Sequence, residues 1–168
     1  MRPIDPELFG PDQQCFGCGP TNPVGMKLHF HRDGEDAVVT TLHPRPGWEG
    51  APGVLHGGLQ ATLIDELGAW TVVAVTGNFG FTTSMQVRYL RPVRADQPVD
   101  GRGELVERGA STARVRIRLT QGGDALAMAT VSYLLPTLAQ AESIMGGPVP
   151  DAWRHLTRDG VDDDASSA

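Results

Sequence analysis

One long apolar segment, residues 57–76, constrains the fold of this chain more than any other feature. Apolar positions recur along it every three to four residues, which is the spacing of one face of an α-helix; they are Leu59, Leu63, Leu67, Trp70 and Ala74. Gly77-Asn78 follows directly and is typical of a helix C-terminus. We therefore predict one long helix between about residues 57 and 76.

The rest of the chain alternates strand-like runs with turn residues. Residues 26–32 and 36–43 flank Asp33-Gly34, a strong hairpin signal. Four more predicted strands follow the helix, at 82–91, 99–107, 112–120 and 124–135. About six antiparallel strands and one helix indicate an α+β fold. Because one helix covers only one face of a sheet, the other face is solvated or buried by another subunit.

The chain divides into three predicted parts. Residues 1–25 are rich in Pro and Gly and form an irregular N-terminal segment. Residues 26–136 form one domain, and residues 137–168 form a C-terminal extension with a short helix and an acidic tail. Residues 158–168 hold four Asp and one Arg, which is half of the net charge of −6. Such a sequence buries too little apolar surface to order itself.

Composition excludes several classes of function. The net charge of −6 argues against nucleic acid as a partner. No segment approaches the roughly 20 apolar residues of a membrane span, and the N-terminus lacks the apolar core of a signal peptide. We therefore expect a cytoplasmic protein with neither a membrane nor a nucleic-acid partner. The only cysteines, Cys15 and Cys18, make no disulfide framework.

The start of the predicted helix carries the strongest chemical signal. Gly57 and Gly58 leave backbone N–H groups uncovered at a helix N-terminus, where the dipole favours an anion. Such an end can stabilise the oxyanion of an acyl-transfer transition state. Asp65, two turns into the helix, could activate water or attack a carbonyl carbon itself. Together these residues predict an acyl-transfer site.

The spacing between these groups indicates a shared site. Eight residues at about 1.5 Å each place Asp65 roughly 12 Å along the axis from Gly57. Both groups can serve one reaction only if they come from different copies of the helix, as in a two-fold dimer with antiparallel helices. Small residues surround Asp65 on its face and leave room for a partner helix or a ligand: Gly58, Ala61, Thr62, Gly68, Ala69 and Val72.

Three motifs resemble the hotdog-fold thioesterases. They are Trp48-Glu49-Gly50-Ala51-Pro52-Gly53-Val54-Leu55-His56-Gly57-Gly58, then Asp65, then Tyr89-Leu90-Arg91-Pro92. The branch that they resemble is the phenylacetate-pathway (PaaI-type) and 4-hydroxybenzoyl-CoA thioesterase group, and the lead-in Cys15–Gly25 is similar to one that precedes this domain in many such proteins. The resemblance covers roughly residues 15–136.

This resemblance implies a sheet wrapped around the central helix, homodimers that often pair into tetramers, and acyl-CoA as substrate. It implies that the Gly57 N–H is the oxyanion donor and that Asp65 of the partner subunit is the general base or nucleophile. Thr82 is the nearest match to a Ser or Thr that helps to place the water, with Thr83 and Ser84 beside it. Gly50 occupies a position where some members carry an Asn or Gln that contacts the thioester or the nucleophilic water. No side chain at position 50 of this chain can make that contact.

Other candidate site residues have simpler structural interpretations. His56 is a general base or, in the favoured interpretation, a cap that fixes the loop. Trp48 lines an acyl pocket or anchors its loop, and Gly58 is a second candidate donor to substrate. Arg91 and Arg94 are the better candidates for CoA phosphate contact. The row Arg114, Arg116 and Arg118 fits a solvated sheet face better.

Cys15-x-x-Cys18 leaves three interpretations open. Two thiolates are half of a zinc site, which His29, His31 or His43 would have to complete. A redox switch and a packed structural segment are the others, and the last is favoured, so we assign no metal ligand. Glu66 points about 100° away from Asp65 around the helix and is expected to be solvated or paired.

The sequence thus predicts an acyl-CoA thioesterase that needs no metal or cofactor, because the helix end supplies the electrophilic assistance. Two alternatives remain: an enoyl-CoA hydratase or dehydratase on the same fold, and a non-catalytic protein that binds acyl-CoA or a small ligand.

Overall fold

The computed structural model describes residues 1–160, and residues 161–168, most of the predicted acidic tail, lie outside the described residues. The elements are β1 (Arg2–Pro3), β2 (His31–Arg32), β3 (Ala37–Leu42), α1 (Gly57–Thr76), β4 (Phe81–Tyr89), β5 (Val99–Arg108), β6 (Thr112–Gln121), β7 (Asp124–Leu134), α2 (Leu138–Met145) and α3 (Asp151–Arg154). The predicted helix has the expected bounds, and the four predicted strands after it differ by a residue or two at their ends.

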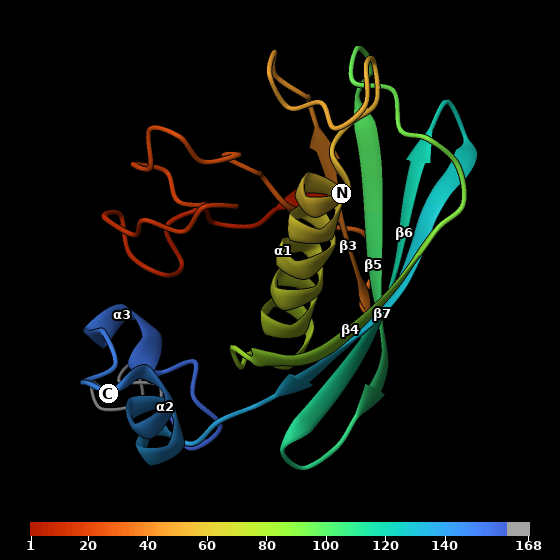
Figure 1. Ribbon diagram of the computed structural model, residues 1–168. Coiled ribbons are helices and arrows are strands. Elements are labelled where there is room, and N and C mark those ends of the chain that lie inside the picture. The colour runs from red at the N-terminus through yellow and green to blue at the C-terminus, as the bar shows by residue number, and fades with distance from the viewer. Residues whose placement is uncertain (161–168) are drawn as a thin grey trace.

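The seven strands form one antiparallel sheet in the order β1-β2-β3-β5-β6-β7-β4. Helix α1 lies along one face of this sheet, with β4 as the strand at one edge (Figure 1). A sheet that wraps around a single long helix is the architecture of the hotdog fold, so the predicted fold class is confirmed. The predicted six strands become seven because the N-terminus adds the two-residue strand β1.

Both ends of α1 are fixed by local hydrogen bonds. At the start, the Gly58 N–H donates to Nδ1 of His56 over 2.9 Å. At the end, Gly77 adopts a left-handed conformation with φ of 75°, and its N–H donates to the Val73 carbonyl. Glycine enters this conformation without the penalty that a Cβ imposes. The predicted C-terminal cap is therefore confirmed.

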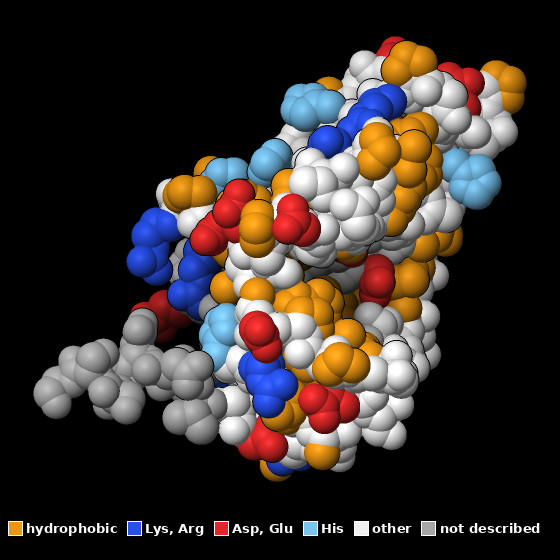
Figure 2. Space-filling model, turned by 90° about the vertical axis from the view of Figure 1, so that its left-hand side faces the viewer, with side chains coloured by type: hydrophobic (Ala, Val, Ile, Leu, Met, Phe, Trp, Pro, Cys, Tyr) orange, Lys and Arg blue, Asp and Glu red, His pale blue; other side chains and the backbone are white. Residues whose placement is uncertain are grey.

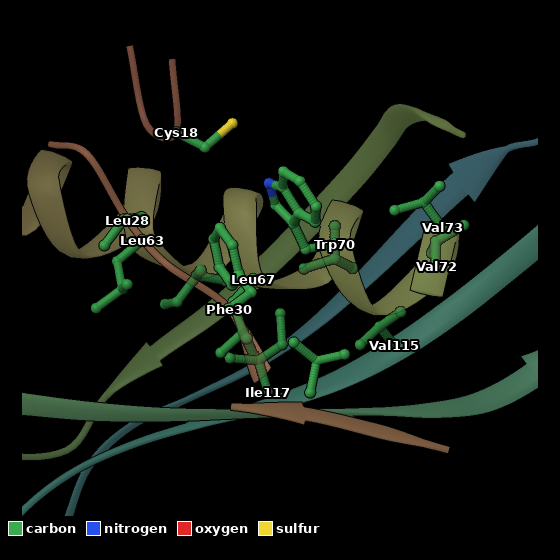
Figure 3. Packing of buried hydrophobic residues seen from close by; sticks show 14 of the residues in the cluster. Cys18, Leu28, Phe30, Leu63, Leu67, Trp70, Val72, Val73, Val115 and Ile117 are labelled. Atoms are coloured by element: carbon green, nitrogen blue, oxygen red, sulfur yellow. The ribbon is translucent and has the colours of Figure 1, made fainter. Parts of the chain in front are cut away.

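The core lies between α1 and the sheet. Leu63, Leu67 and Trp70 of α1 are buried and face apolar side chains of β6, such as Ile117 (Figure 3). The ring of Phe30 stacks on Trp70, with 5.0 Å between the ring centroids and 17° between the planes. Burying large apolar side chains of this kind contributes about 1.5–3 kcal/mol each, so the helical periodicity read from the sequence also fixes how α1 is rotated.

Glycines allow α1 to approach the sheet closely. A Cβ at Gly103 of β5 would lie 2.4 Å from Oγ1 of Thr71, and one at Gly101 would lie 2.8 Å from Cδ2 of Leu67. On the helix side, a Cβ at Gly68 would lie 2.0 Å from the hydroxyl oxygen of Tyr133 in β7. Side chains at these positions would push the helix away from the sheet.

The first predicted strand, 26–32, is wrong over most of its length, since only His31–Arg32 pair in the sheet. The segment before them is held by the N-terminal segment instead: the Met26 N–H donates to the Phe16 carbonyl, and the Leu28 N–H to the Gly17 carbonyl. Lys27 between them has a positive φ of 55°, which no regular strand contains. Alternate side chains are still buried, and this burial produced the strand-like pattern.

The C-terminal extension folds back on the start of the chain. The indole N–H of Trp153 in α3 donates to the Phe9 carbonyl over 2.8 Å, and the Phe79 N–H donates to the Leu156 carbonyl over 2.9 Å. Residues 137–157, predicted to hold one short helix, hold α2 and α3.

On the side of the molecule viewed in Figure 2, Lys and Arg side chains are dispersed among acidic ones and do not form a single patch.

The contact at Gly68 gives a prediction about stability. Elsewhere in a helix, Gly→Ala is stabilising by about 0.5–1 kcal/mol, but Gly68→Ala should lower the free energy of unfolding by ~1–3 kcal/mol because Tyr133 is buried and cannot move aside. Chemical denaturation measures this. The same substitution in a Tyr133→Phe background should cost less, since the clashing hydroxyl is gone. Equal costs in both backgrounds would contradict the explanation.

Candidate functional site

The N-terminus of α1 leaves one backbone donor free. His56 caps the helix: its side chain accepts from the Gly58 N–H, and its carbonyl accepts from the Leu59 and Gln60 N–H groups. Within residues 1–160, no hydrogen bond takes the Gly57 N–H. An uncovered N–H at this end of a 20-residue helix points its partial positive charge at whatever binds there. The favoured interpretation of His56 as a cap agrees with this geometry.

A cavity of about 540 Å³ opens at this helix end. Its lining combines the loop before α1, the first turn of the helix and the end of β4: Gly50, Ala51, Val54, Leu55, His56, Gly57, Gln60, Tyr89, Leu90, Arg91 and Pro92. The hydroxyl of Tyr89 donates to the Gly57 carbonyl over 3.1 Å and ties β4 to the start of α1. Gly57, whose N–H is free, therefore lines a cavity large enough for part of a ligand.

Asp65 lies farther along α1, beside β4. Oγ1 of Thr82 donates to Oδ1 of Asp65 over 2.7 Å, a short bond to a charged acceptor. The hydroxyl of Tyr133 donates to the Asp65 carbonyl over 3.2 Å, and burial raises the pKa of Tyr133 far above its usual range. Among the three hydroxyls considered from the sequence, Thr82 is the one that contacts the acid, whereas Thr83 donates to the Ser132 carbonyl.

The strand beside Asp65 is open to the surroundings. β4 is an edge strand, and all its residues except Phe81 and Val87 are exposed. The exposed residues include Met85 and Tyr89, and Met128 of the neighbouring β7 is exposed as well. An open nine-residue edge with exposed apolar side chains is the kind of surface that pairs with another chain. The Asp65–Thr82 pair lies directly beside it.

The structure separates the other predicted site residues. Trp48 is partly buried outside the cavity lining: its carbonyl accepts from the His56 N–H over 2.9 Å, and Arg45 lies over its ring at 5.1 Å. This geometry anchors the loop before α1. Gly58 does not offer a second free donor, because its N–H is used by His56.

The candidate phosphate ligands form exposed ion pairs. Arg91 pairs with Asp124 at 2.9 Å and Arg94 with Asp96 at 2.9 Å. Arg94 is exposed, and the hydrogen bonds that it donates to Asp96 raise its pKa. Arg91 lines the cavity at the start of α1, whereas Arg94 does not. In the arginine row on β6, Arg114 pairs with Glu107 at 2.7 Å, in agreement with a solvated sheet face.

Sequence reasoning missed Gln60. Its side chain is 4% exposed and lines the cavity, and its Nε2 donates to the Leu55 carbonyl over 2.9 Å. Its Oε1 is buried and has no partner within the described residues. Such atoms are rare and indicate a ligand, a water molecule or an ion. A polar residue at a buried helical position was the available signal.

At Gly50, a Cβ would lie 3.2 Å from the His56 ring, so the cap leaves little room for a side chain there.

Of the two expectations for Glu66, solvated or paired, the structure agrees with the second. It is partly buried and accepts a hydrogen bond from Sγ of Cys15 over 2.9 Å. Burial raises the pKa of Glu66 to about 8, and the neighbouring Cys15 adds to this effect. The hydrogen bond from Cys18 lowers the pKa of Cys15 to about 5. Glu66 is therefore paired with the N-terminal segment and lies apart from the cavity at the start of α1.

None of the helices in the described part of the chain is both long enough and apolar enough to cross a membrane.

Comparisons with known proteins agree with this architecture. Residues 52–128 match the family model of the thioesterase superfamily. Acyl-coenzyme A thioesterase THEM4 of Bos taurus is 32% identical over 96 residues, which cover 54% of this chain and 38% of that protein. The match therefore spans about two fifths of the length of this curated relative.

Solved structures show the same fold. A hypothetical thioesterase from Streptococcus pneumoniae, solved with coenzyme A, has a TM-score of 0.59 and 25% identity, covering 64% of this chain and 86% of its own. A thioesterase from Haemophilus influenzae has a TM-score of 0.62 and 20% identity, covering 70% and 83%. A phenylacetic acid degradation-related protein from Ralstonia eutropha has a TM-score of 0.60 and 22% identity, covering 65% and 85%.

Residues 52–128 include the free Gly57 N–H, the His56 cap and the Asp65–Thr82 pair. This segment of the chain is therefore similar to the thioesterase superfamily, and the fold of the chain is the hotdog fold.

Proposed function

We propose that this protein hydrolyses acyl-CoA thioesters to a free carboxylic acid and CoA. The observation that carries the proposal is the uncovered Gly57 N–H in the wall of a cavity at the start of α1. A thioester carbonyl oxygen placed there would be polarised, and the oxyanion that forms in the transition state would be stabilised. The names of relatives support the substrate class: one is an acyl-coenzyme A thioesterase and another was solved with coenzyme A.

Asp65 supplies the second half of the proposed chemistry. As a general base, it takes a proton from water while the water oxygen bonds to the carbonyl carbon, and the carbon–sulfur bond breaks when the resulting oxyanion collapses. As a nucleophile, it forms a mixed anhydride with release of CoA, and water then opens this anhydride. In both routes the sulfur departs as the CoA thiolate, which takes a proton from the protonated Asp65 in the first route and from solvent water in the second. Thr82 orients the carboxylate through its 2.7 Å hydrogen bond.

The site requires two subunits in this proposal. Gly57 and Asp65 lie on one helix, roughly 12 Å apart along its axis, so one carbonyl group cannot reach both. The open edge at β4 supports a two-fold dimer in which the helices run antiparallel and each helix start meets the partner's Asp65. We further expect two such dimers to pair into a tetramer.

Substrate contacts follow from the cavity. Arg91 and Arg94 hold solvent-exposed ion pairs, which stabilise a protein little, so CoA phosphates could replace the acids without large cost. Gln60 would offer its unpartnered Oε1 to a polar group of the substrate or to water. The hydratase alternative is weaker, because Nδ1 of His56 is used in the cap.

The first prediction concerns activity itself. The protein should release thiol from at least one member of a panel of short-chain, long-chain and aromatic acyl-CoA thioesters. Asp65→Asn should lower kcat by ~10²-fold or more, because the acid/base group is lost, while its Oδ1 still accepts from Thr82. Tight CoA binding without thiol release across the panel would favour the binding-protein alternative, and unchanged turnover in Asp65→Asn would remove the role of this residue.

Two substitutions at Gly57, one that deletes its N–H and one that keeps it, test the proposed oxyanion donor. Gly57→Pro deletes the N–H at the first helical position, where proline is well tolerated, and the ψ of 133° at His56 suits a residue before proline. We expect kcat to fall by ~10²–10³-fold with the helix content unchanged by circular dichroism. Gly57→Ala is the matched control: it keeps the N–H, and its Cβ makes only ordinary contacts with Tyr89 at 3.9 Å. Equal activity of the two variants would contradict the assignment.

Hybrid dimers test whether the site is shared. Gly57→Pro and Asp65→Asn subunits, each nearly inactive alone, are mixed after unfolding and refolded together. Half of randomly formed dimers are hybrids, and each hybrid has one intact site of two, so activity should recover to about a quarter of wild type. No recovery, with hybrids demonstrated by mass spectrometry, would place both groups of a site in one subunit.

A further inference from the structure

A second cluster of chemically active side chains lies on a neighbouring face of α1, about 100° around the helix from Asp65. Sγ of Cys15, Sγ of Cys18 and a carboxylate oxygen of Glu66 all lie within 4.8 Å of one another. Cys18 and Glu66 come from segments far apart in the sequence, the N-terminal segment and the middle of α1. In Figure 3, Cys18 lies on the side of α1 away from the sheet.

Two glycines in the local sequence allow these three groups to lie close together. A Cβ at Gly17 would lie 2.1 Å from Cγ of Glu66, so only glycine lets the loop lie against this side chain. A Cβ at Gly19 would lie 2.6 Å from the backbone of Cys15, whose carbonyl accepts from the Gly19 N–H over 2.9 Å. The run Cys15-Phe16-Gly17-Cys18-Gly19 is therefore a tight turn packed directly on Glu66.

The cluster lacks a positive charge. Glu66 forms no ion pair with Lys, Arg or His in the described part of the chain, and its hydrogen bond comes from a thiol. A partly buried carboxylate with two thiols and no cation is costly when ionised. A bound divalent cation would supply the missing charge.

We propose that Cys15, Cys18 and Glu66 form a binding site for a zinc ion. Two thiolates and a carboxylate are ligands that zinc accepts in tetrahedral geometry. Donor atoms on one tetrahedral zinc lie roughly 3.3–3.8 Å apart, given metal–ligand bonds of about 2.0–2.3 Å. The three donors are thus already within about 1 Å of this arrangement.

The surroundings suit such a site. A cavity of about 220 Å³ lies beside the cluster and leaves room for water as the fourth ligand. Nε2 of Gln13 donates to Sγ of Cys18 over 3.6 Å, a contact that would support the thiolate. The ion would join the N-terminal segment to α1 one residue from Asp65. His29 and His31 line a different cavity and do not take part, so the third ligand is Glu66 and not a histidine.

Cobalt substitution tests the site directly. The full-length protein, reduced and freed of metal with a chelator, is titrated with Co²⁺. We expect one equivalent to bind, with a thiolate-to-cobalt charge-transfer band in the near ultraviolet, strong visible bands of tetrahedral cobalt, and displacement by Zn²⁺. Cys15→Ser, Cys18→Ser and Glu66→Gln should each weaken binding by roughly 100-fold or more. His29→Ala and His31→Ala are controls that should bind as wild type does.

Thermal unfolding keeps the test decisive if a cysteine variant fails to fold. Zn²⁺ should raise the Tm of wild type, since a ligand bound only to the folded state stabilises it, and it should leave the Tm of the near-isosteric Glu66→Gln unchanged. Equal cobalt affinity in Glu66→Gln and wild type would overturn the three-donor site. Absence of the charge-transfer band while both thiols react with a thiol reagent would overturn metal binding. A Cys15–Cys18 disulfide that resists reduction in the folded protein would also overturn it.

Discussion

The close packing of α1 on the sheet is the constraint on which the rest of the molecule depends. Glycines at Gly68, Gly101 and Gly103 remove the side chains that would hold the helix away. As a result, the hydroxyl of Tyr133 reaches the Asp65 carbonyl, and Thr82 at the sheet edge reaches the Asp65 carboxylate. A helix even 1 Å farther out would lose these contacts, because hydrogen bonds weaken quickly beyond about 3.2 Å. The packing of α1 on the sheet therefore also determines the geometry around Asp65.

Two adjacent acids on α1 meet very different surroundings because of the helical rotation of about 100° per residue. Asp65 turns toward β4 and an exposed edge, where a hydroxyl donates to it. Glu66 turns toward the N-terminal segment, where a thiol donates to it and burial raises its pKa to about 8. Two neighbouring carboxylic acids thus support two distinct proposals, hydrolysis at Asp65 and metal binding at Glu66 on the adjacent face of the helix.

Local signals allowed much of this fold to be predicted. The apolar period predicted α1, Gly77 predicted its end, and the alternation of apolar and polar residues predicted β6. Each of these patterns depends only on residues that are close together in the sequence. Residues 26–30 were misread because burial on alternate sides imitates a strand, although their hydrogen bonds go to residues 16 and 17. That pairing depends on where the N-terminal segment folds back, which no local pattern encodes.

The same distinction separates the parts of the site. The choice of Thr82 over its neighbours needed only the resemblance and the start of a strand, and the structure then showed its contact with Asp65. The environment of Glu66 could not be predicted, because its partner Cys15 lies 51 residues away in the sequence. Gln60 was missed for a similar reason: its unpartnered oxygen is visible only when the cavity wall is assembled from three segments.

The open edge at β4 connects the fold to the proposed chemistry. A sheet closed at both edges would bury Asp65 within one subunit, where the same helix carries Gly57 roughly 12 Å away along its axis and no carbonyl group could contact both. The exposed β4 leaves Asp65 beside a surface that a second copy can cover, and in the proposed dimer a two-fold axis would bring each free N–H to the partner's acid. The same residues that leave the monomer's edge unprotected would in this way complete two active sites at once.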